Sequence, residues 1–437
     1  MGNLHRQHYD TLEIGRFIAA LLVMLFHVTP VAQKVYGDYP FADIFRAGHF
    51  GVEYFFVLSG FLMYMIHADH LGQKGSGLEF IRRRAVRILP AYWIVLFTLI
   101  IGLTVMPALA HDHDLSFSKI VRDMFLLSWD EKMILGVSWT LKREMIFYGI
   151  FAICLLLPWL RLWPLWIWQG SIIVANILYP EVSGFDRGNE FFSTVNLGFG
   201  AGMLIAMFLR SGWLLRANPK LLWDFVTIGV AGLLICSMLE WLWHEGSSHS
   251  LTPLGPLTSP LIYTTLSTFI VAGLVGLESQ RRINLSGTPA ILGRCSYALY
   301  LLHAPFLSVS MRILKKIGID DVALAAVIAC AGAVVCSMLF YWLVEGPLLK
   351  WLNRATAPKK RAAEGAPATP GPAPQTRSGR QTIGDRAAAV AAAAVAERPF
   401  PPRPRKPKRV KDPTQGAAPI LLQRGPGGRM ILARPLR

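Results

Sequence analysis

The sequence predicts an all-α protein that crosses a membrane many times. Hydrophobic residues make up 53% of its 437 residues and charged residues only 16%, whereas about a quarter of the residues in a soluble domain are charged. Apolar stretches long enough to span a bilayer as a helix recur along the chain. We expect about ten transmembrane helices, at residues 12–32, 50–66, 88–106, 139–157, 162–179, 191–209, 222–243, 259–277, 291–311 and 322–343.

The last part of the chain differs in composition from the rest. Residues 355–437 are rich in Pro, Ala, Gly and Arg, and they contain 17 Lys and Arg against 4 Asp and Glu. A segment of this kind cannot bury a hydrophobic core, so we expect it to be disordered. The sequence therefore predicts a transmembrane domain over residues 1–354 and a basic tail over residues 355–437. The tail can contact anionic membrane lipid, and we expect no nucleic-acid partner.

Lysine and arginine in the short loops predict how the helices are oriented. With ten helices, most basic loops share one side of the membrane with both chain ends. These loops carry Lys74, Arg82, Arg83, Arg84, Arg87, Arg161, Arg210, Arg216, Lys220, Arg281 and Arg282. Because basic loops stay in the cytoplasm, we expect both termini to be cytoplasmic. Lys315 and Lys316, on the opposite side, are the one exception.

The first apolar stretch carries two ionisable residues on one face. Arg16 and His27 are eleven positions apart, which places them on the same side of a helix and roughly 16 Å apart along its axis. Ionisable groups inside a bilayer usually face the protein interior or a water-filled cavity, and they often mark function. The alternative is an arginine that reaches the lipid headgroups and a histidine that only packs.

The stretch that begins at residue 139 carries a candidate partner for His27. Glu144 and Tyr148 are four residues apart and therefore neighbours on one helix face. Glu144 lies about as deep below the outer surface as His27, and a carboxylate that hydrogen-bonds a histidine orients it and raises its basicity. The alternative is that Glu144 pairs with Lys142 or Arg143.

Two further segments stand out. The arginine cluster from Arg82 to Arg87 can anchor the topology, or it can bind phosphate, which the guanidinium fork matches well. In the second apolar stretch, Ser59 and Gly60 permit close helix approach, and we expect tight packing at Gly60.

Taken together, six motifs in order resemble the acyltransferase 3 family of integral membrane acyltransferases, which modify bacterial surface glycans and related acceptors. They are Arg-x10-His (Arg16, His27), the Gly-Val-x-x-Phe-Phe-x-Leu-Ser-Gly-Phe segment (Gly51 to Phe61), the arginine-rich loop that ends in Pro90 and Tyr92, Trp-Thr-Leu-x-x-Glu-x-x-Phe-Tyr (Trp139 to Tyr148), Ser-Tyr-x-x-Tyr-x-x-His-x-Pro (Ser296 to Pro305) and Glu345-x-Pro347. Each motif is weak alone, but all six in this order on a ten-helix pattern are specific. The resemblance covers residues from about 9 to 352.

The resemblance implies a multi-pass enzyme of the bacterial inner membrane. It implies that an acyl group, by default acetyl, passes from acyl-CoA on the cytoplasmic side to a hydroxyl of an acceptor, often outside. Members most similar in character act in exopolysaccharide assembly. A glycan or lipid-linked oligosaccharide is therefore the expected acceptor, and other polysaccharide-assembly proteins are candidate partners. Acyl-CoA is a co-substrate, and no cofactor or metal is expected.

On this hypothesis the residues divide into donor-binding and catalytic groups. Arg82, Arg83, Arg84 and Arg87 hold the CoA phosphates, and Arg16 contacts the pantetheine arm or its phosphate end. His27 is the general base on the acceptor hydroxyl, and Glu144 orients it. The residues expected to shape the acceptor site are Ser59, Trp139, Tyr148 and His303. A covalent acyl-histidine or acyl-serine at Ser59 remains an open alternative.

Other functions are compatible with part of this pattern. A transporter or flippase would also need intramembrane Arg, His and Glu, but it predicts inverted internal repeats, which the sequence does not reveal. A membrane scaffold would depend on its basic tail and not on His27. Among enzymes, a different membrane-bound O-acyltransferase family is the alternative.

Overall fold

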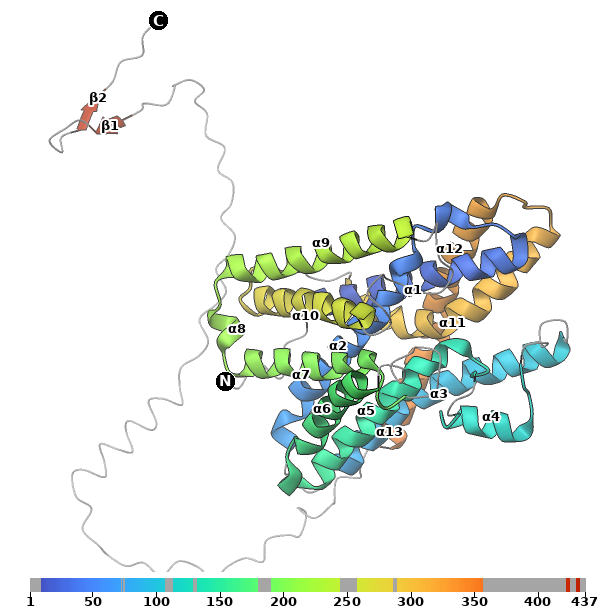
Figure 1. The fold of residues 1–437 in the computed structure, drawn as a ribbon, viewed down its shortest axis with the longest axis horizontal. Coiled ribbons are helices and arrows are strands. Elements are labelled where there is room, and N and C mark those ends of the chain that lie inside the picture. Colours follow the sequence, from blue (N-terminus) through green and yellow to red (C-terminus); the bar gives the residue numbers. More distant parts are fainter. Residues whose placement is uncertain are drawn as a thin grey trace, which may run out of the picture. The chain divides into compact units, whose positions relative to one another are not determined.

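The computed structural model describes two separate parts of the chain. It covers residues 9–356, apart from 72, 74, 107–112, 129–131, 180–189, 244–257 and 286–288, and also residues 422–424 and 430–432. The chain divides into two compact units, Met1–Lys359 and Lys360–Arg437. The described residues of the first unit form a helical bundle (Figure 1), which confirms the all-α class.

Thirteen α-helices make up the described part of the first unit. They are α1 (Asp10–Tyr36), α2 (Gly51–His67), α3 (Ser76–Val105), α4 (Phe117–Met124), α5 (Trp139–Leu156), α6 (Trp163–Leu178), α7 (Leu197–Arg210), α8 (Trp213–Arg216), α9 (Pro219–Trp243), α10 (Thr258–Ser279), α11 (Pro289–Lys316), α12 (Val322–Phe340) and α13 (Gly346–Ala355). Short 3₁₀ turns join several of them, and a π-helical turn (Tyr341–Glu345) connects α12 to α13.

Each of the ten apolar stretches lies on a helix, but the expected ten spans are not confirmed. Within the described ranges, seven helices are long and apolar enough to cross a membrane. The helices α6 and α7 have only 16 and 14 residues. The helix α5 has 18 residues, and three consecutive charged ones, Lys142 to Glu144, interrupt its apolar character.

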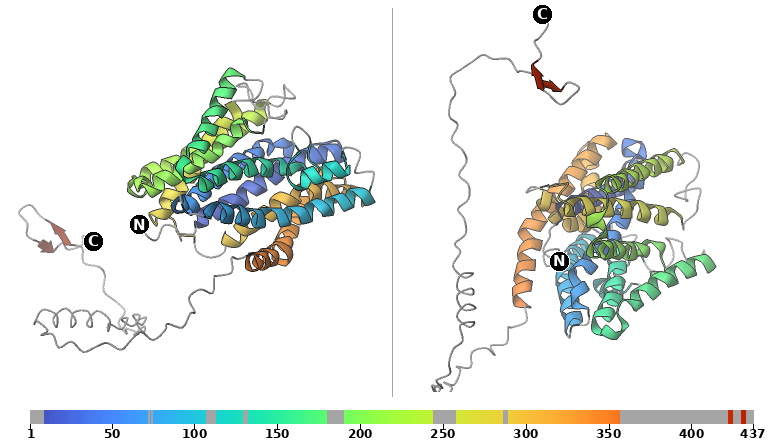
Figure 2. Two further views of the ribbon diagram at one scale, coloured as in Figure 1. Left: turned by 90° about the horizontal axis from the view of Figure 1, so that it is seen from below. Right: turned by 90° about the vertical axis from the view of Figure 1, so that its left-hand side faces the viewer.

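Three clusters of buried apolar side chains form the core, and α2 lies where they meet. One cluster joins α2 to α3, α5, α6 and α7, a second joins α2 to α7, α9 and α10, and a third joins α1 to α11 and α12. Phe55 of α2 packs against all three. Figures 1 and 2 show α9 beside α10. Side chains on different faces of α2 therefore contact different parts of the bundle.

The helices α1 and α11 lie side by side and run in the same direction. Glu13 lies against Gly293 near their first turns, and Lys315 donates a hydrogen bond to the carbonyl of Val35 near their last turns, at 2.6 Å. Residues at matching heights on the two helices therefore become neighbours. This alignment decides which side chains surround His27.

Gly60 brings α2 and α7 into close contact. A Cβ atom at this position would collide with the backbone of Phe199 on α7. Gly202 of α7 likewise faces the backbone of Val57. Small residues let helix backbones approach in this way, so the tight packing predicted at Gly60 is confirmed.

Six described residues of the tail form a short β-ladder. Strands β1 (Leu422–Arg424) and β2 (Met430–Leu432) pair antiparallel, with Gln423 opposite Ile431. The predicted disorder of residues 355–437 does not extend to these six. Residues 357–421, 425–429 and 433–437, on which the rest of that prediction falls, lie outside the described part of the chain.

Candidate functional site

A cavity of about 440 Å³ lies inside the first unit, between α1, α2, α3, α5 and α11. Apolar side chains, mainly from α2, form much of its wall. Five charged residues also line it, namely Glu13, Arg16, Arg84, Arg87 and Glu144. The cavity therefore combines an apolar wall with three guanidinium groups, and it receives residues from five of the six motifs.

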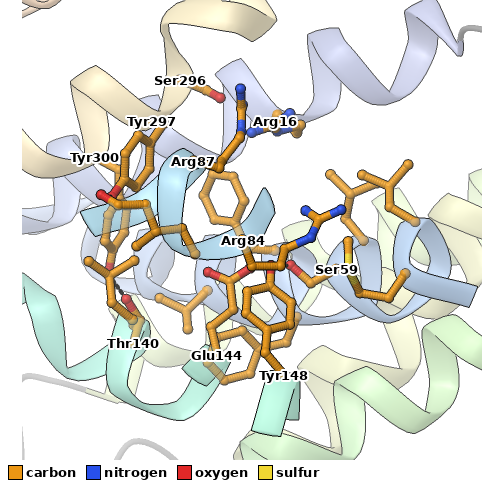
Figure 3. A pocket seen from close by; sticks show the side chains of 18 of the residues that line it. Arg16, Ser59, Arg84, Arg87, Thr140, Glu144, Tyr148, Ser296, Tyr297 and Tyr300 are labelled. Carbon is orange, nitrogen blue, oxygen red and sulfur yellow. Dashed lines mark hydrogen bonds between the residues drawn. The ribbon is translucent and has the colours of Figure 1, made fainter. Parts of the chain in front are cut away.

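Three of the five predicted donor-binding arginines reach this cavity. Arg16 comes from α1, and Arg84 and Arg87 come from the first half of α3. In Figure 3, Arg16 and Arg87 lie together near Ser296, and Arg84 lies closer to Tyr148. The guanidinium of Arg84 is 5.5 Å from the centre of the Tyr148 ring.

The other two arginines of the cluster are held elsewhere. Arg82 donates to both carboxylate oxygens of Glu79, at 2.7 and 2.6 Å, and to the hydroxyl of Thr356. Arg83 donates to Glu79 at 2.6 Å, and its side chain is 59% exposed. Neither lines the cavity. The cluster of four predicted from the sequence is therefore divided, because Glu79 draws two of its members to the helix surface.

Glu144 lies in the cavity wall, but it does not contact His27 as expected. One of its carboxylate oxygens accepts hydrogen bonds from the hydroxyl of Ser59, at 2.9 Å, and from the hydroxyl of Tyr148. Three of the predicted site residues therefore meet in one polar group (Figure 3). The expected pairing of Glu144 with the histidine is wrong, because α11, and not α5, lies against α1 at the height of His27.

His27 contacts a second histidine instead. Its ring lies edge-on to that of His303, with ring centres 5.0 Å apart. His303 is fully buried and lies 5.8 Å from the ring of Tyr300, which lines the cavity. His27 and His303 are not lining residues themselves. A chain of ring contacts through Tyr300 and His303 thus connects the cavity wall to His27.

Backbone carbonyls fix the tautomer of both histidines. His27 Nδ1 lies 2.8 Å from the carbonyl oxygen of Val23, and His303 Nδ1 lies 3.1 Å from that of Leu299. A carbonyl oxygen only accepts hydrogen bonds, so Nδ1 carries the proton in each ring. In the neutral form, Nε2 then has the free lone pair. A carbonyl thus gives His27 the orientation that the sequence analysis assigned to Glu144.

Trp139 and its neighbours form a separate group at the start of α5. Arg143 lies over the Trp139 ring, 4.6 Å from its centre. Glu190 accepts from Lys142 at 2.6 Å and from Arg143 at 2.9 Å. The alternative that Glu144 pairs with these cations is therefore not observed. Trp139 directly precedes Thr140, which lines the cavity, but Trp139 does not line it itself.

The structure also gathers buried polar residues that the sequence analysis did not single out. Tyr263 donates to Glu240 at 2.7 Å, and His49 Nε2 lies 3.5 Å from the other Glu240 oxygen. Glu53, on α2, is 3% exposed. Charged residues within apolar stretches are a functional signal in themselves, so Glu53 and Glu240 could have been found in that way.

Glu345 is a further buried carboxylate near the cavity. It belongs to the π-helical turn after α12, is fully buried, and neither carboxylate oxygen has a hydrogen-bond partner among the described residues. Its charge interacts with those of Arg87 and Arg16. From the sequence, Glu345 is predicted only to end the last apolar stretch together with Pro347, as part of the sixth motif.

Comparisons with known proteins show to which family the chain belongs. The model of the acyltransferase 3 family, described as an acyltransferase domain, matches residues 9–342. The chain is similar to the exopolysaccharide production protein ExoZ of Rhizobium meliloti (strain 1021), with 30% identity over 335 residues, which cover 75% of this chain and 95% of that protein. No solved structure matches the chain significantly. Because the family match spans most of the chain and includes all the cavity-lining helices, the protein belongs to the acyltransferase 3 family and is a multi-pass membrane acyltransferase.

Proposed function

We propose that this acyltransferase moves an acyl group, by default acetyl, from acyl-CoA to a hydroxyl of a glycan in exopolysaccharide production. The similarity to ExoZ, an exopolysaccharide production protein, supports the glycan acceptor. The charge pattern of the loops supports a bacterial inner-membrane protein with cytoplasmic termini, so that acyl-CoA enters at the end of the bundle that carries Arg16, Arg84 and Arg87.

The observation that carries the proposal is the meeting of three guanidinium groups with an apolar wall in one cavity. Arg16, Arg84 and Arg87 come from two helices and line the same space. Guanidinium groups bind phosphates by paired, charge-assisted hydrogen bonds. Coenzyme A has phosphates at one end and, at the other, a long uncharged arm that ends in the thioester. The arginines are therefore assigned to the phosphate end, and the side chains of α2 to the pantetheine arm and thioester.

Transfer then proceeds by direct attack of the acceptor. His27 Nε2 takes the proton from the acceptor hydroxyl, and the hydroxyl oxygen attacks the thioester carbonyl. The carbon–sulfur bond breaks, and the CoA thiolate leaves and takes up the proton that the His27 imidazolium releases. The carbonyl of Val23 holds the imidazole in the tautomer this step needs. His303 packs against the ring and limits its rotation.

A covalent route through Ser59 also has a specific observation in its favour. The Ser59 hydroxyl donates to Glu144 at 2.9 Å in the cavity wall, and a carboxylate in that position can accept its proton. Ser59 would then take the acyl group first and pass it to the acceptor. Ser59→Ala separates the two routes. If transfer is direct, this variant should keep its activity within a few-fold of wild type. If the route is covalent, the variant should lose its activity, and the acyl-enzyme that can be trapped in the wild type should no longer form.

The proposed function is tested by following both substrates. The purified full chain in nanodiscs is given acyl-CoA and deacylated exopolysaccharide, and the consumption of acyl-CoA and the mass of the glycan are measured. We expect one acyl increment on the glycan for each CoA released. In cells, loss of the gene should remove that increment from the polysaccharide. If no acyl-CoA is consumed and the polysaccharide keeps its acyl groups, a transporter or flippase becomes the better interpretation.

A further inference from the structure

Four cations gather where α1 and α11 end. Lys34, Arg312, Lys315 and Lys316 line an open hollow of about 380 Å³ together with Val35. We refer to it as the terminal basic hollow. It includes Lys315 and Lys316, the two residues whose place contradicts the positive-inside pattern. Neither the cavity nor the His27–His303 pair accounts for these charges.

The hollow lies at the opposite end of the α1–α11 pair from the cavity arginines. Lys34 follows Arg16 by eighteen residues, which is about 27 Å along a helix. His27 lies between them and precedes Lys34 by roughly 10 Å, or two turns. Arg312 follows His303 on the parallel partner helix at a similar interval. The same two helices therefore carry, in order, Arg16, the histidine pair and the hollow.

Local contacts hold two of these cations, and one of the two reaches across to α1. Lys315 donates across to the carbonyl of Val35 at 2.6 Å and lies over the Tyr36 ring, 5.4 Å from its centre. Arg312 donates to the carbonyl of Ser308 at 2.8 Å. These contacts fix the side chains but leave their charges uncompensated.

The nearby carboxylates that the structure describes do not pair with the three cations of α11, Arg312, Lys315 and Lys316. Asp321 accepts from the backbone nitrogen of Leu324 at 2.8 Å and caps α12, and Asp38 accepts from that of Tyr39 at 2.7 Å. Asp320 is exposed. Among the described residues, no carboxylate forms an ion pair with the three cations of α11. Cations at a helix C-terminus gain from the helix dipole, but that effect does not require cations from two helices to share one hollow.

We propose that the terminal basic hollow binds a phosphoryl group carried by the glycan acceptor. This rests on the proposed function, in which the end of the bundle away from the arginines is the acceptor side. The three cations of α11 match a multiply charged phosphate or diphosphate better than a single carboxylate, and the Arg312 fork adds bidentate geometry. Held there, the acceptor has a hydroxyl within two helical turns of His27.

Binding of inorganic diphosphate tests the site directly. The full chain is placed in phosphatidylcholine nanodiscs, and calorimetry measures the Kd for coenzyme A and then the Kd for diphosphate with coenzyme A present at saturation. Arg312→Gln and the double change Lys315→Gln/Lys316→Gln should each weaken diphosphate binding by about tenfold or more, as the loss of a charge-assisted hydrogen bond predicts. Their Kd for coenzyme A should stay unchanged. Lys220→Gln, an exposed lysine on α9, is the charge-matched control and should alter neither.

Two further arms separate the possible outcomes. With acyl-CoA at saturation, so that the cavity arginines are occupied, diphosphate should compete with the glycan acceptor, and the α11 variants should raise the acceptor KM. Removing these lysines strengthens the positive-inside bias, so the helix orientation is preserved. Unchanged diphosphate affinity in the variants overturns the proposal. The proposal is also overturned if added phosphatidylglycerol occupies the hollow and the acceptor KM stays the same. The hollow would then be a binding site for a lipid headgroup. If the wild-type protein does not bind coenzyme A, the proposed donor is wrong, and the proposal for the hollow is unaffected.

Discussion

At the scale of single residues, His27 is the side chain on which the proposed chemistry depends most. His27→Ala should lower acyl transfer by about 10²–10⁴-fold, the usual contribution of a general base, while membrane abundance stays near normal. The measurement is the rate of glycan acylation in membranes at matched protein level. His70→Ala removes an exposed imidazole at the end of α2 and is the control. A His27 variant with activity within a few-fold of wild type would remove this residue from the mechanism.

The division of the arginine cluster leads to a prediction about Arg84 and Arg87. Lysine keeps the charge but cannot form the planar bidentate contact with phosphate. Arg84→Lys or Arg87→Lys should therefore raise the KM for acyl-CoA several-fold. The topology should not change, since lysine and arginine count alike in the positive-inside rule. The measurement is acyl-CoA saturation kinetics in membranes.

Arg82 and Arg83 provide matched controls on the same helix. Both are engaged with Glu79 outside the cavity, and a lysine can keep that ion pair. Arg82→Lys and Arg83→Lys should leave the donor KM near the wild-type value. If they raise it as much as the cavity variants do, the donor phosphates lie at the surface of α3 and not in the cavity.

Much of the site could be predicted from residue types, but its pairings could not. Arg16, Ser59, Glu144 and Tyr148 were all expected at the site, because polar groups in apolar stretches and their spacing on a helix are visible in a sequence. The partner of His27 was not predictable. It depends on which helix lies against α1, and depth in the membrane alone does not determine that.

At the scale of helices, α2 has a central position because it borders all three core clusters. One of its faces carries Ser59 into the cavity, and the adjacent position, Gly60, packs against α7. The packing of one face of α2 against α7 therefore determines where Ser59 lies in the cavity. Replacing a residue on the face of α2 that packs against α7 can thus change activity, although that residue contacts neither substrate.

Gly60→Ala tests this coupling. The added Cβ meets the backbone of Phe199, so α2 and α7 must separate, and overpacking of this kind costs about 1–3 kcal/mol. We expect a lower melting midpoint in detergent and a lower acylation rate. Gly149→Ala, on α5, is the matched control, because a Cβ there has no neighbour within 4 Å and alanine favours a helix. Equal melting midpoints for Gly60→Ala and wild type would show that this contact is not tight in the membrane.

The helices themselves were largely predictable, since apolar length is a strong signal. The number of spans was less so. The helix α5 contains three charges, and α6 and α7 are short. Composition and length alone therefore do not determine whether these three helices cross the bilayer. Helix neighbours depend on packing details such as Gly60 and Gly202, which become meaningful only when both helices are seen together.

At the scale of the whole molecule, the two units are expected to have different roles. The family match ends at residue 342, and every residue that lines the cavity or the terminal basic hollow precedes residue 317. The basic tail carries none of these residues. It contributes charge, which can attract the chain to anionic lipid, but no group to the proposed acyl transfer.

A truncation after Lys359 should therefore insert and acylate normally. The cut follows the boundary of the first unit and keeps Thr356, whose hydroxyl contacts Arg82. A second truncation, before Gly346, removes α13 and is expected to destabilise the bundle, since α13 packs near α3. Glycan acylation per inserted molecule is the measurement, with the salt dependence of membrane binding followed in parallel. If the first truncation inserts at normal levels but loses acylation, the tail takes part in the chemistry. The basic run from Arg403 to Lys411 would then be the segment to examine.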